Sequence, residues 1–140
     1  MPRVVLDTNV LVAALRSDRG ASFQVLSMVG GSRFEIVVSV ALVLEYEDAL
    51  VRHLPESPLD SDDVGDLLDY LCSVAHRQEI FYLWRPVLRD PADDMILELA
   101  VASGSGFIVT FNERDFVGCE AFNIQVVTPR RFLEEIGGLS

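Results

Sequence analysis

Short apolar runs alternate along this 140-residue chain with longer segments that have helical spacing. The runs are too short for helices and predict strands at residues 3–6, 35–38, 78–83, 107–110 and 124–127. Strands that alternate with helices favour a parallel sheet with both faces covered, because each parallel connection needs a crossover segment. We therefore expect an α/β fold in which residues 1–140 form one domain.

The helical segments carry start and stop signals. Ser39, Asp90 and Thr128 are N-cap candidates, and a proline follows two of them at the first helical position. Glycine pairs or prolines close most of the segments. The expected helices span residues 10–15, 21–29, 39–53, 62–76, 91–102 and 129–137.

Acidic residues follow the ends of the first two predicted strands. In open parallel sheets, binding sites form beyond the carboxyl ends of the strands. Asp7 directly follows the first strand, where it can be either the N-cap of the next helix or a functional carboxylate. Glu45 lies in the helix after the second strand, with Ala41 and Ala49 among its helical neighbours. A glutamate in apolar surroundings needs a partner or a metal ion.

Three aspartates open the helix that begins near residue 91. Asp90 is the expected N-cap. Asp93 shares a helical face with Ile96 and Leu97, the stripe expected to be buried, whereas Asp94 falls at the boundary of that face. We therefore favour Asp93 as a ligand and keep Asp94 in reserve. The alternative for Asp93 is a first-turn acid that complements the helix dipole.

The loop after the fourth predicted strand holds Asp115. Thr110 and Asn112 are positioned to hold this loop through side-chain bonds to the backbone. Considered alone, Asp115 could be a turn residue.

The combination of acids is more informative than any one of them. Four carboxylates fall at or near one edge of the predicted sheet, and if they converge they cannot all stay ionised without cations between them. Ligand sets made of oxygen alone favour Mg²⁺ or Mn²⁺ over zinc. The two histidines and two cysteines lie outside these segments, so neither a histidine-based mechanism nor a structural zinc site or disulfide is supported. The candidate ligands are Asp7, Glu45, Asp93 and Asp115.

The net charge of −11 is unusual for a protein that binds nucleic acid. Bound divalent cations would reverse the field locally, and part of the acidity is segregated in residues 56–69. All basic residues other than histidine are arginine, a bias that we attribute to genomic base composition. No apolar run is long enough to span a bilayer and no signal peptide is recognisable, so a cytoplasmic location without membrane association is expected.

Five segments resemble a PIN domain, close to the toxin components of bacterial toxin–antitoxin systems. They are VVLDTNVLVAAL, SVALVLEYEDAL, RDPADDMILELAVA, FIVTFNERDF and VVTPRRFLEEI, which begin at residues 4, 39, 89, 107 and 126. The segments keep the family's order and span nearly the whole chain. The resemblance implies a three-layer α/β/α sandwich with a Rossmann-like parallel sheet in the order 3-2-1-4-5, and metal-dependent hydrolysis of RNA.

The resemblance also implies roles for individual residues. Asn9, Thr110 and Asn112 would orient ligands or contact the scissile phosphate, and Asp94, the reserve from the helical wheel, is a further candidate for such a contact. Many relatives have an aspartate where this chain has Asn112. Others have asparagine there and an acid three residues later, as at Asp115. The acids that would hold one or two Mg²⁺ or Mn²⁺ ions are Asp7, Glu45, Asp93 and Asp115.

The partners implied by the resemblance are RNA as the substrate, a small antitoxin protein and a second copy of the chain in a homodimer. The alternative from another class is a catalytically silent interaction module in which the acids are helix caps. Two other enzyme classes are disfavoured. A dehalogenase-type phosphatase needs a second aspartate where this chain has Asn9, and a phosphorelay receiver needs a lysine, a residue absent from this chain.

Overall fold

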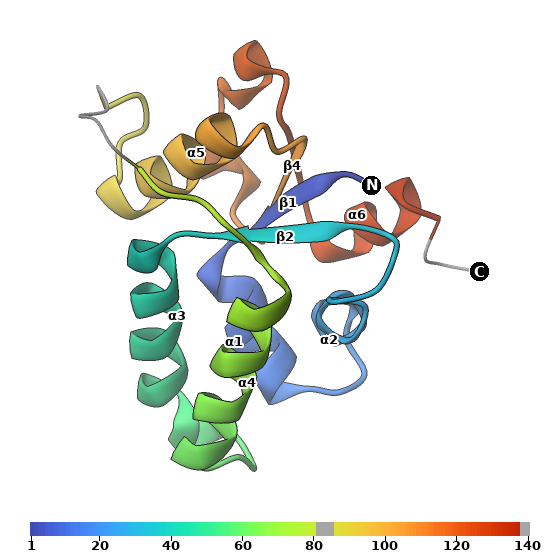
Figure 1. The fold of residues 1–140 in the computed structure, drawn as a ribbon, viewed down its shortest axis with the longest axis vertical. Helices are drawn as coiled ribbons and strands as arrows, with labels where there is room; N and C mark the ends of the chain where they lie inside the picture. Colours follow the sequence, from blue (N-terminus) through green and yellow to red (C-terminus); the bar gives the residue numbers. More distant parts are fainter. Residues whose placement is uncertain (81–85, 138–140) are drawn as a thin grey trace.

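A computed structural model of the chain describes residues 1–80 and 86–137. A sheet of five parallel strands lies at its centre, in the order β3-β2-β1-β4-β5 (Figure 1). The predicted α/β class and strand order are confirmed. The strands are β1 (Arg3–Leu6), β2 (Glu35–Val38), β3 (His76–Arg77), β4 (Phe107–Val109) and β5 (Gln125–Val127).

Helices cover both faces of the sheet, as a parallel sheet requires. Figure 1 shows α5 (Pro91–Ser103) on one face, where it packs against β1, β2 and β4. The opposite face is covered by α1 (Thr8–Arg16), α2 (Ala21–Ser27), α3 (Val40–Arg52) and α4 (Ser61–Val74). The last helix, α6 (Pro129–Glu135), packs against α2 and β5. Three short 3₁₀ helices complete the described chain: η1 (Leu54–Glu56), η2 (Glu113–Phe116) and η3 (Cys119–Phe122).

The central strand explains why an apolar run of this kind predicts the sheet so well. Val4 and Val5 of β1 are completely buried, because β1 lies between β2 and β4 and under helices on both faces. Such a strand has no solvent face, and its sequence is continuously apolar rather than alternating. The first polar residue after it, Asp7, therefore marks the point where the strand leaves the core.

The predicted N-caps are confirmed. The Ser39 hydroxyl accepts a hydrogen bond from the Leu42 amide at 3.1 Å at the start of α3. Asp90 and Thr128 cap α5 and α6 in the same manner, each followed by proline. These caps matter for function, because they fix where α3 and α5 begin relative to the strand ends.

Strand β3 differs from its prediction. The strand expected at residues 78–83 is instead His76–Arg77, and α4 ends at Val74 rather than continuing to residue 76. Its partner β2 ends at Val38 and turns into α3, so the pairing stops after the Gln78 amide donates to the Val38 carbonyl. Residues 81–83 of the predicted strand lie outside the described residues.

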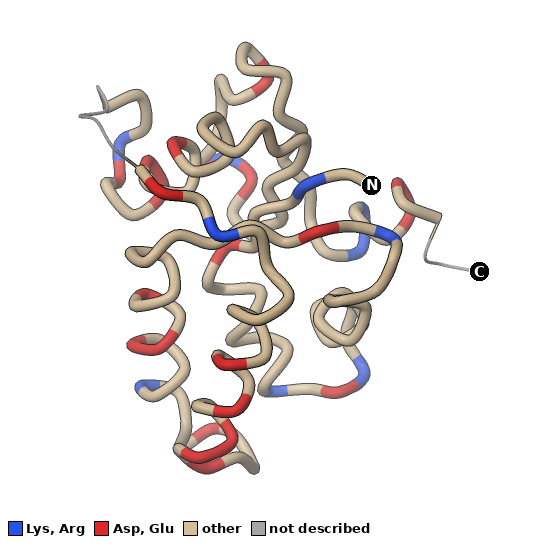
Figure 2. Tube along the Cα trace, viewed as in Figure 1, with Lys and Arg blue, Asp and Glu red and all other residues tan. Residues whose placement is uncertain are grey.

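The acidic segment at residues 56–69 lies at the end of α3 and the beginning of α4 (Figure 2). Its acids are exposed, and they lie away from the sheet edge at which α1, α3 and α5 begin (Figure 2). In the part of the chain that the structure describes, no helix is both long and apolar enough to cross a membrane.

Candidate functional site

Asp7 lies at the carboxyl edge of the sheet, where β1 ends between β2 and β4. It is only 8 % exposed. Its Oδ1 accepts a hydrogen bond from the Thr8 amide at 2.8 Å, and its Oδ2 accepts one from the Thr110 hydroxyl at 2.7 Å. Asp7 is therefore the N-cap of α1, one of the two alternatives predicted, and its second oxygen is held from the end of β4. Because Asp7 caps the helix, α1 begins at Thr8 rather than at residue 10.

Thr110 organises the loop that follows β4. Its fully buried hydroxyl oxygen accepts hydrogen bonds from the Asn112 amide at 3.0 Å and from the Asn9 side chain at 3.4 Å. The Asn9 side-chain oxygen in turn accepts from the Phe111 amide at 3.4 Å. Thr110 thus holds the loop as predicted. The Asn112 side chain is exposed, and the backbone carbonyl of Asn112 is what accepts from the Asp115 amide.

Helix α3 brings Glu45 to the same edge. The residue next to it, Tyr46, is buried, and its hydroxyl donates a hydrogen bond to the backbone carbonyl of Leu6, the last residue of β1. This bond ties α3 to the strand end that carries Asp7. Sequence reasoning missed the role of Tyr46, although its position one turn after Leu42 and one turn before Leu50 marks it as part of the buried stripe.

The four predicted acids are electrostatic neighbours. Burial is the main cause that raises the pKa of Asp7, and the charges of Glu45 and Asp115 raise it further, against the bonds from Thr110 and Thr8. Burial also raises the pKa of Asp93 to about 6, with added repulsion from Asp7, Asp90, Asp115 and Glu45. Like charges that disfavour one another's ionisation in this way must lie near one another. The structure therefore brings together carboxylates that are up to 108 residues apart in the sequence.

The donor set suits a hard divalent cation, since it consists of carboxylate oxygens supplemented by amide and hydroxyl oxygens. Among the described residues, however, no three acid, histidine or cysteine side chains are already arranged to hold a metal ion. Asp7 is fixed by its two hydrogen bonds. Glu45 and Asp93 are half-buried and Asp115 is exposed, so all three carboxylates are accessible to a cation from solution.

The expected burial of Asp93 and Asp94 was wrong. Asp94, assigned to the boundary of the helix, is the buried one at 8 % exposure, and Asp93 is half-buried. The Asp94 Oδ1 accepts hydrogen bonds from the amides of Val87 and Leu88, each at 3.0 Å. Asp94 therefore anchors the segment that leads into α5, and Asp93 is the residue whose pKa is raised by the charges of the other acids.

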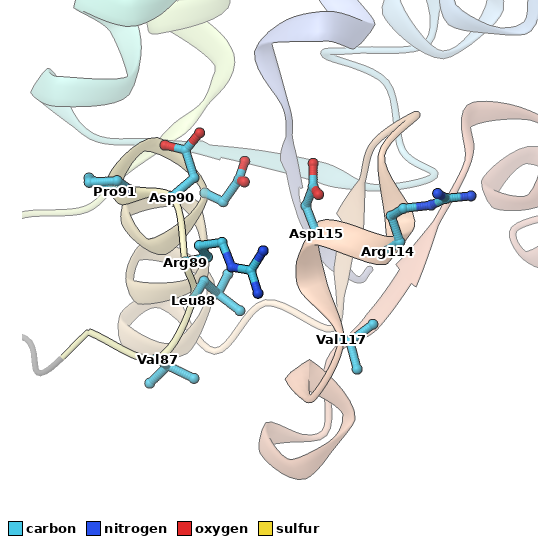
Figure 3. A pocket seen from close by; sticks show the side chains of 9 residues that line it. Val87, Leu88, Arg89, Asp90, Pro91, Arg114, Asp115 and Val117 are labelled. Carbon is cyan, nitrogen blue, oxygen red and sulfur yellow. The ribbon is translucent and has the colours of Figure 1, made fainter.

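A pocket of about 1090 Å³ opens between the start of α5 and η2. In Figure 3 Asp90 lies on the α5 wall and Asp115 on the η2 wall, and the guanidinium group of Arg89 extends from the first wall toward the second. Sequence reasoning did not single out the two arginines of this pocket. The lining residues are Val87, Leu88, Arg89, Asp90, Pro91, Asp93, Arg114, Asp115 and Val117.

The histidines lie away from these acids in sequence, and each has a partner of its own. His53 pairs with Glu56 beside Arg16, and His76 bonds to the Gln78 side chain. Neither histidine lines the pocket between α5 and η2.

Comparison with known proteins gives the family and the fold. A solved structure, described as the crystal structure of VapBC2 from Rickettsia felis bound to a DNA fragment from their promoter, contains a similar chain. The two chains are 16 % identical, superpose with a TM-score of 0.56, and match over 89 % of this chain and 96 % of that one. A search of curated protein sequences gave no significant match. Residues 3–114, well over half of the sequence, match the PIN domain family. The chain therefore belongs to the PIN domain family.

Proposed function

We propose that this protein is a metal-dependent nuclease that hydrolyses RNA phosphodiester bonds, with Mg²⁺ or Mn²⁺ as its cofactor. PIN domains are generally nucleases, and the chain belongs to that family. The observation that carries the proposal is geometric: Asp7 is buried at the carboxyl edge of the sheet and held by Thr8 and Thr110, and Asp93 and Asp115 line one pocket. The repulsion that raises the pKa of Asp7 and of Asp93 agrees with this arrangement. Acids that only cap helices have no reason to gather at one place, whereas a cation site needs them together.

Each acid has a separate structural role in this proposal. Asp7 is the rigid member, since Thr110 and Thr8 fix both of its oxygens. Glu45, Asp93 and Asp115 approach it from α3, α5 and η2. A divalent cation bound there would lower the pKa of a water molecule and neutralise charge on a phosphate.

The polar residues around the acids support them in different ways. Asn9 bonds to Thr110 and to the loop after β4, so it positions the support of Asp7. Asn112 has an exposed side chain at the rim, where it can contact a substrate phosphate. Asp94 holds the backbone before α5 and therefore acts on Asp93 through the position of the helix.

The first experiment compares two glutamates of α3. RNA cleavage is measured with Mg²⁺ or Mn²⁺ and with EDTA, for Glu45→Gln and for the matched control Glu47→Gln, whose side chain is exposed. We expect Glu45→Gln to lower the rate by more than about 100-fold, as loss of a metal ligand exceeds loss of a supporting contact. The control should cleave as the wild-type protein does. Cleavage that persists in EDTA, or equal rates for the two variants, would refute the proposal.

We also propose that the protein is the toxin of a cytoplasmic toxin–antitoxin pair and acts as a homodimer. The likeness to a chain of the VapBC2 structure supports this reading at the level of the fold. The partner would be a small protein encoded beside this gene. Co-expression with that protein should suppress the RNA cleavage, and sedimentation of the toxin alone should show a dimer.

The competing function is a catalytically silent interaction module. Calorimetry with Mg²⁺ separates the two possibilities, because a module whose acids are only caps has no cation site. Binding that disappears in Asp7→Asn supports the nuclease, and the absence of binding together with the absence of cleavage supports the module.

A further inference from the structure

The pocket between α5 and η2 contains charges that do not neutralise one another. Five arginines elsewhere pair with carboxylates, and Arg33 bonds to two backbone carbonyls. Within residues 1–80 and 86–137, no carboxylate forms an ion pair with Arg89, although Asp90, Asp93 and Asp115 line the same pocket. Arg114, the other arginine of the pocket, has no ion pair among the described residues either, but its guanidinium group points away from Arg89 in Figure 3. In a protein with a net charge of −11, Arg89 is therefore an unpaired cation among acids and is available to an anion from outside.

The backbone on both sides of Arg89 is fixed. The preceding residue, Leu88, donates its amide to the Asp94 carboxylate at 3.0 Å. The following residue, Asp90, caps α5 through the Ala92 amide at 2.9 Å. The base of the Arg89 side chain is therefore held in place, while the guanidinium group extends across the pocket toward Asp115 (Figure 3). Such an arrangement reduces the entropy lost when the side chain binds a ligand.

A strand of RNA that reaches the acidic cluster meets an unfavourable field. A metal ion would neutralise the scissile phosphate, but the neighbouring phosphates would still lie beside a strongly acidic protein. Arginine binds phosphate with two parallel hydrogen bonds and keeps its charge at all relevant pH values. Beyond Arg89 the pocket ends in two exposed valines, Val87 and Val117, which offer an apolar surface to a base or sugar.

We propose that Arg89 binds a substrate phosphate next to the scissile one, so that the RNA strand runs through the pocket between α5 and η2. The proposal rests on the proposed RNA hydrolysis for its choice of ligand. Arg89 positions the strand and does not take part in the chemical step. Its contribution is an electrostatic contact that is independent of base sequence.

The test measures RNA binding as a function of salt for Arg89→Ala and for the control Arg19→Ala. Both variants change the net charge equally, and Arg19 is an exposed arginine between α1 and α2. The probe is a fluorescein-labelled single-stranded RNA of mixed sequence, bound in EDTA and in CaCl₂ so that binding is separated from cleavage. Each phosphate contact to a single strand contributes about 0.7 to the slope of log Kobs against log salt.

We expect Arg89→Ala to weaken binding by about 10-fold or more and to reduce the magnitude of the slope by about 0.7. Arg89→Lys should keep the slope and lose part of the affinity, since it keeps the charge without the two-pronged geometry. Arg19→Ala should match the wild-type protein.

The binding and cleavage measurements together distinguish a failure of the Arg89 proposal from a failure of the nuclease proposal. If the wild-type protein cleaves RNA but Arg89→Ala retains its slope and affinity, the role of Arg89 is refuted and the nuclease assignment stands. If RNA binds with an Arg89-dependent slope but is never cleaved, the nuclease assignment fails, the contact between Arg89 and an RNA phosphate stands, and its place beside a scissile phosphate is refuted. No binding by the wild-type protein in either buffer overturns the role of Arg89.

Discussion

The bond between Thr110 and Asp7 gives a quantitative test of how the site is built. Thr110→Val keeps the shape of a fully buried side chain and removes only its hydroxyl, so no cavity opens. The lost bond is donated to a carboxylate at 2.7 Å, and bonds of this kind contribute about 1.5–3 kcal/mol. The Asn112 amide and the Asn9 side-chain amide also lose their acceptor, but neither belongs to a buried residue, so both can bind water. We therefore expect the free energy of unfolding to fall by about 2 kcal/mol.

The expected change in melting temperature follows from the size of the chain. An unfolding entropy of about 0.3 kcal/mol/K for 140 residues converts this loss into a fall in Tm of about 7 °C. The effect should also depend on pH. The Thr110 bond lowers the pKa of Asp7 because it favours the ionised carboxylate. In Thr110→Val the pKa of Asp7 should therefore be higher than in the wild-type protein. The destabilisation should be smallest near about pH 4 and should grow as the pH rises through the pKa of Asp7.

Urea unfolding at about pH 4 and about pH 8 measures both effects. Thr110→Ser is the control, because it keeps the hydroxyl and loses a methyl group, so its destabilisation should not depend on pH. A loss below about 0.5 kcal/mol for Thr110→Val, or a loss that is equal at both pH values, would refute the reasoning.

Three further predictions concern the acids. Mg²⁺ at about 100 times its Kd should raise Tm by about 9 °C in differential scanning fluorimetry, and an equal rise in Asp7→Asn would contradict the assigned site. Because the pKa of Asp93 is raised to about 6 from 3.8, the metal-free protein should lose stability between about pH 4 and about pH 6 and level off above. The full shift corresponds to about 3 kcal/mol, which solvent screening of this half-buried group reduces to about 1 kcal/mol, and urea unfolding should show no such loss for Asp93→Asn. Asp94→Ala should destabilise the protein by about 2 kcal/mol and speed hydrogen exchange at the Val87 and Leu88 amides, whereas unchanged exchange would show that Asp94 does not anchor them.

Most of the sheet was predictable because its central strands have no solvent face. A continuous apolar run such as that of β1 has few other uses in a small α/β domain. The edge strand β3 is different, because it has one neighbour and only two residues. Its end is set by where β2 turns into α3, which no pattern within residues 76–83 encodes. The predicted bounds of β3 were therefore wrong because they depend on where its partner strand β2 ends.

The acids were recognisable from their positions after strands, but their surroundings were not. Helical periodicity assigned Asp93 to the buried face, yet the loop before α5 folds over Asp94 and buries it instead. Loops have no periodicity, so a helical wheel cannot predict which helical residues a neighbouring loop will bury. Arg89 was missed for a related reason. The chain has eleven arginines, and the sequence around Arg89 does not distinguish it from the others. Its role becomes recognisable only when the residues on the opposite side of its pocket are known.

The pairing of β1 with β4 has a consequence for the synthesis of the protein. The two strands are joined in register from Val4 with Phe107 to Leu6 with Val109, and the hydroxyl that holds Asp7 comes 103 residues after it. A nascent chain therefore lacks the strand and the hydroxyl that hold Asp7 until β4 and Thr110 have been synthesised, and contacts between residues this distant in sequence form late in folding. Ribosome-bound fragments that stop before Phe107 should be inert, so any hydrolytic activity is withheld from the ribosome until β4 has left it and paired with β1.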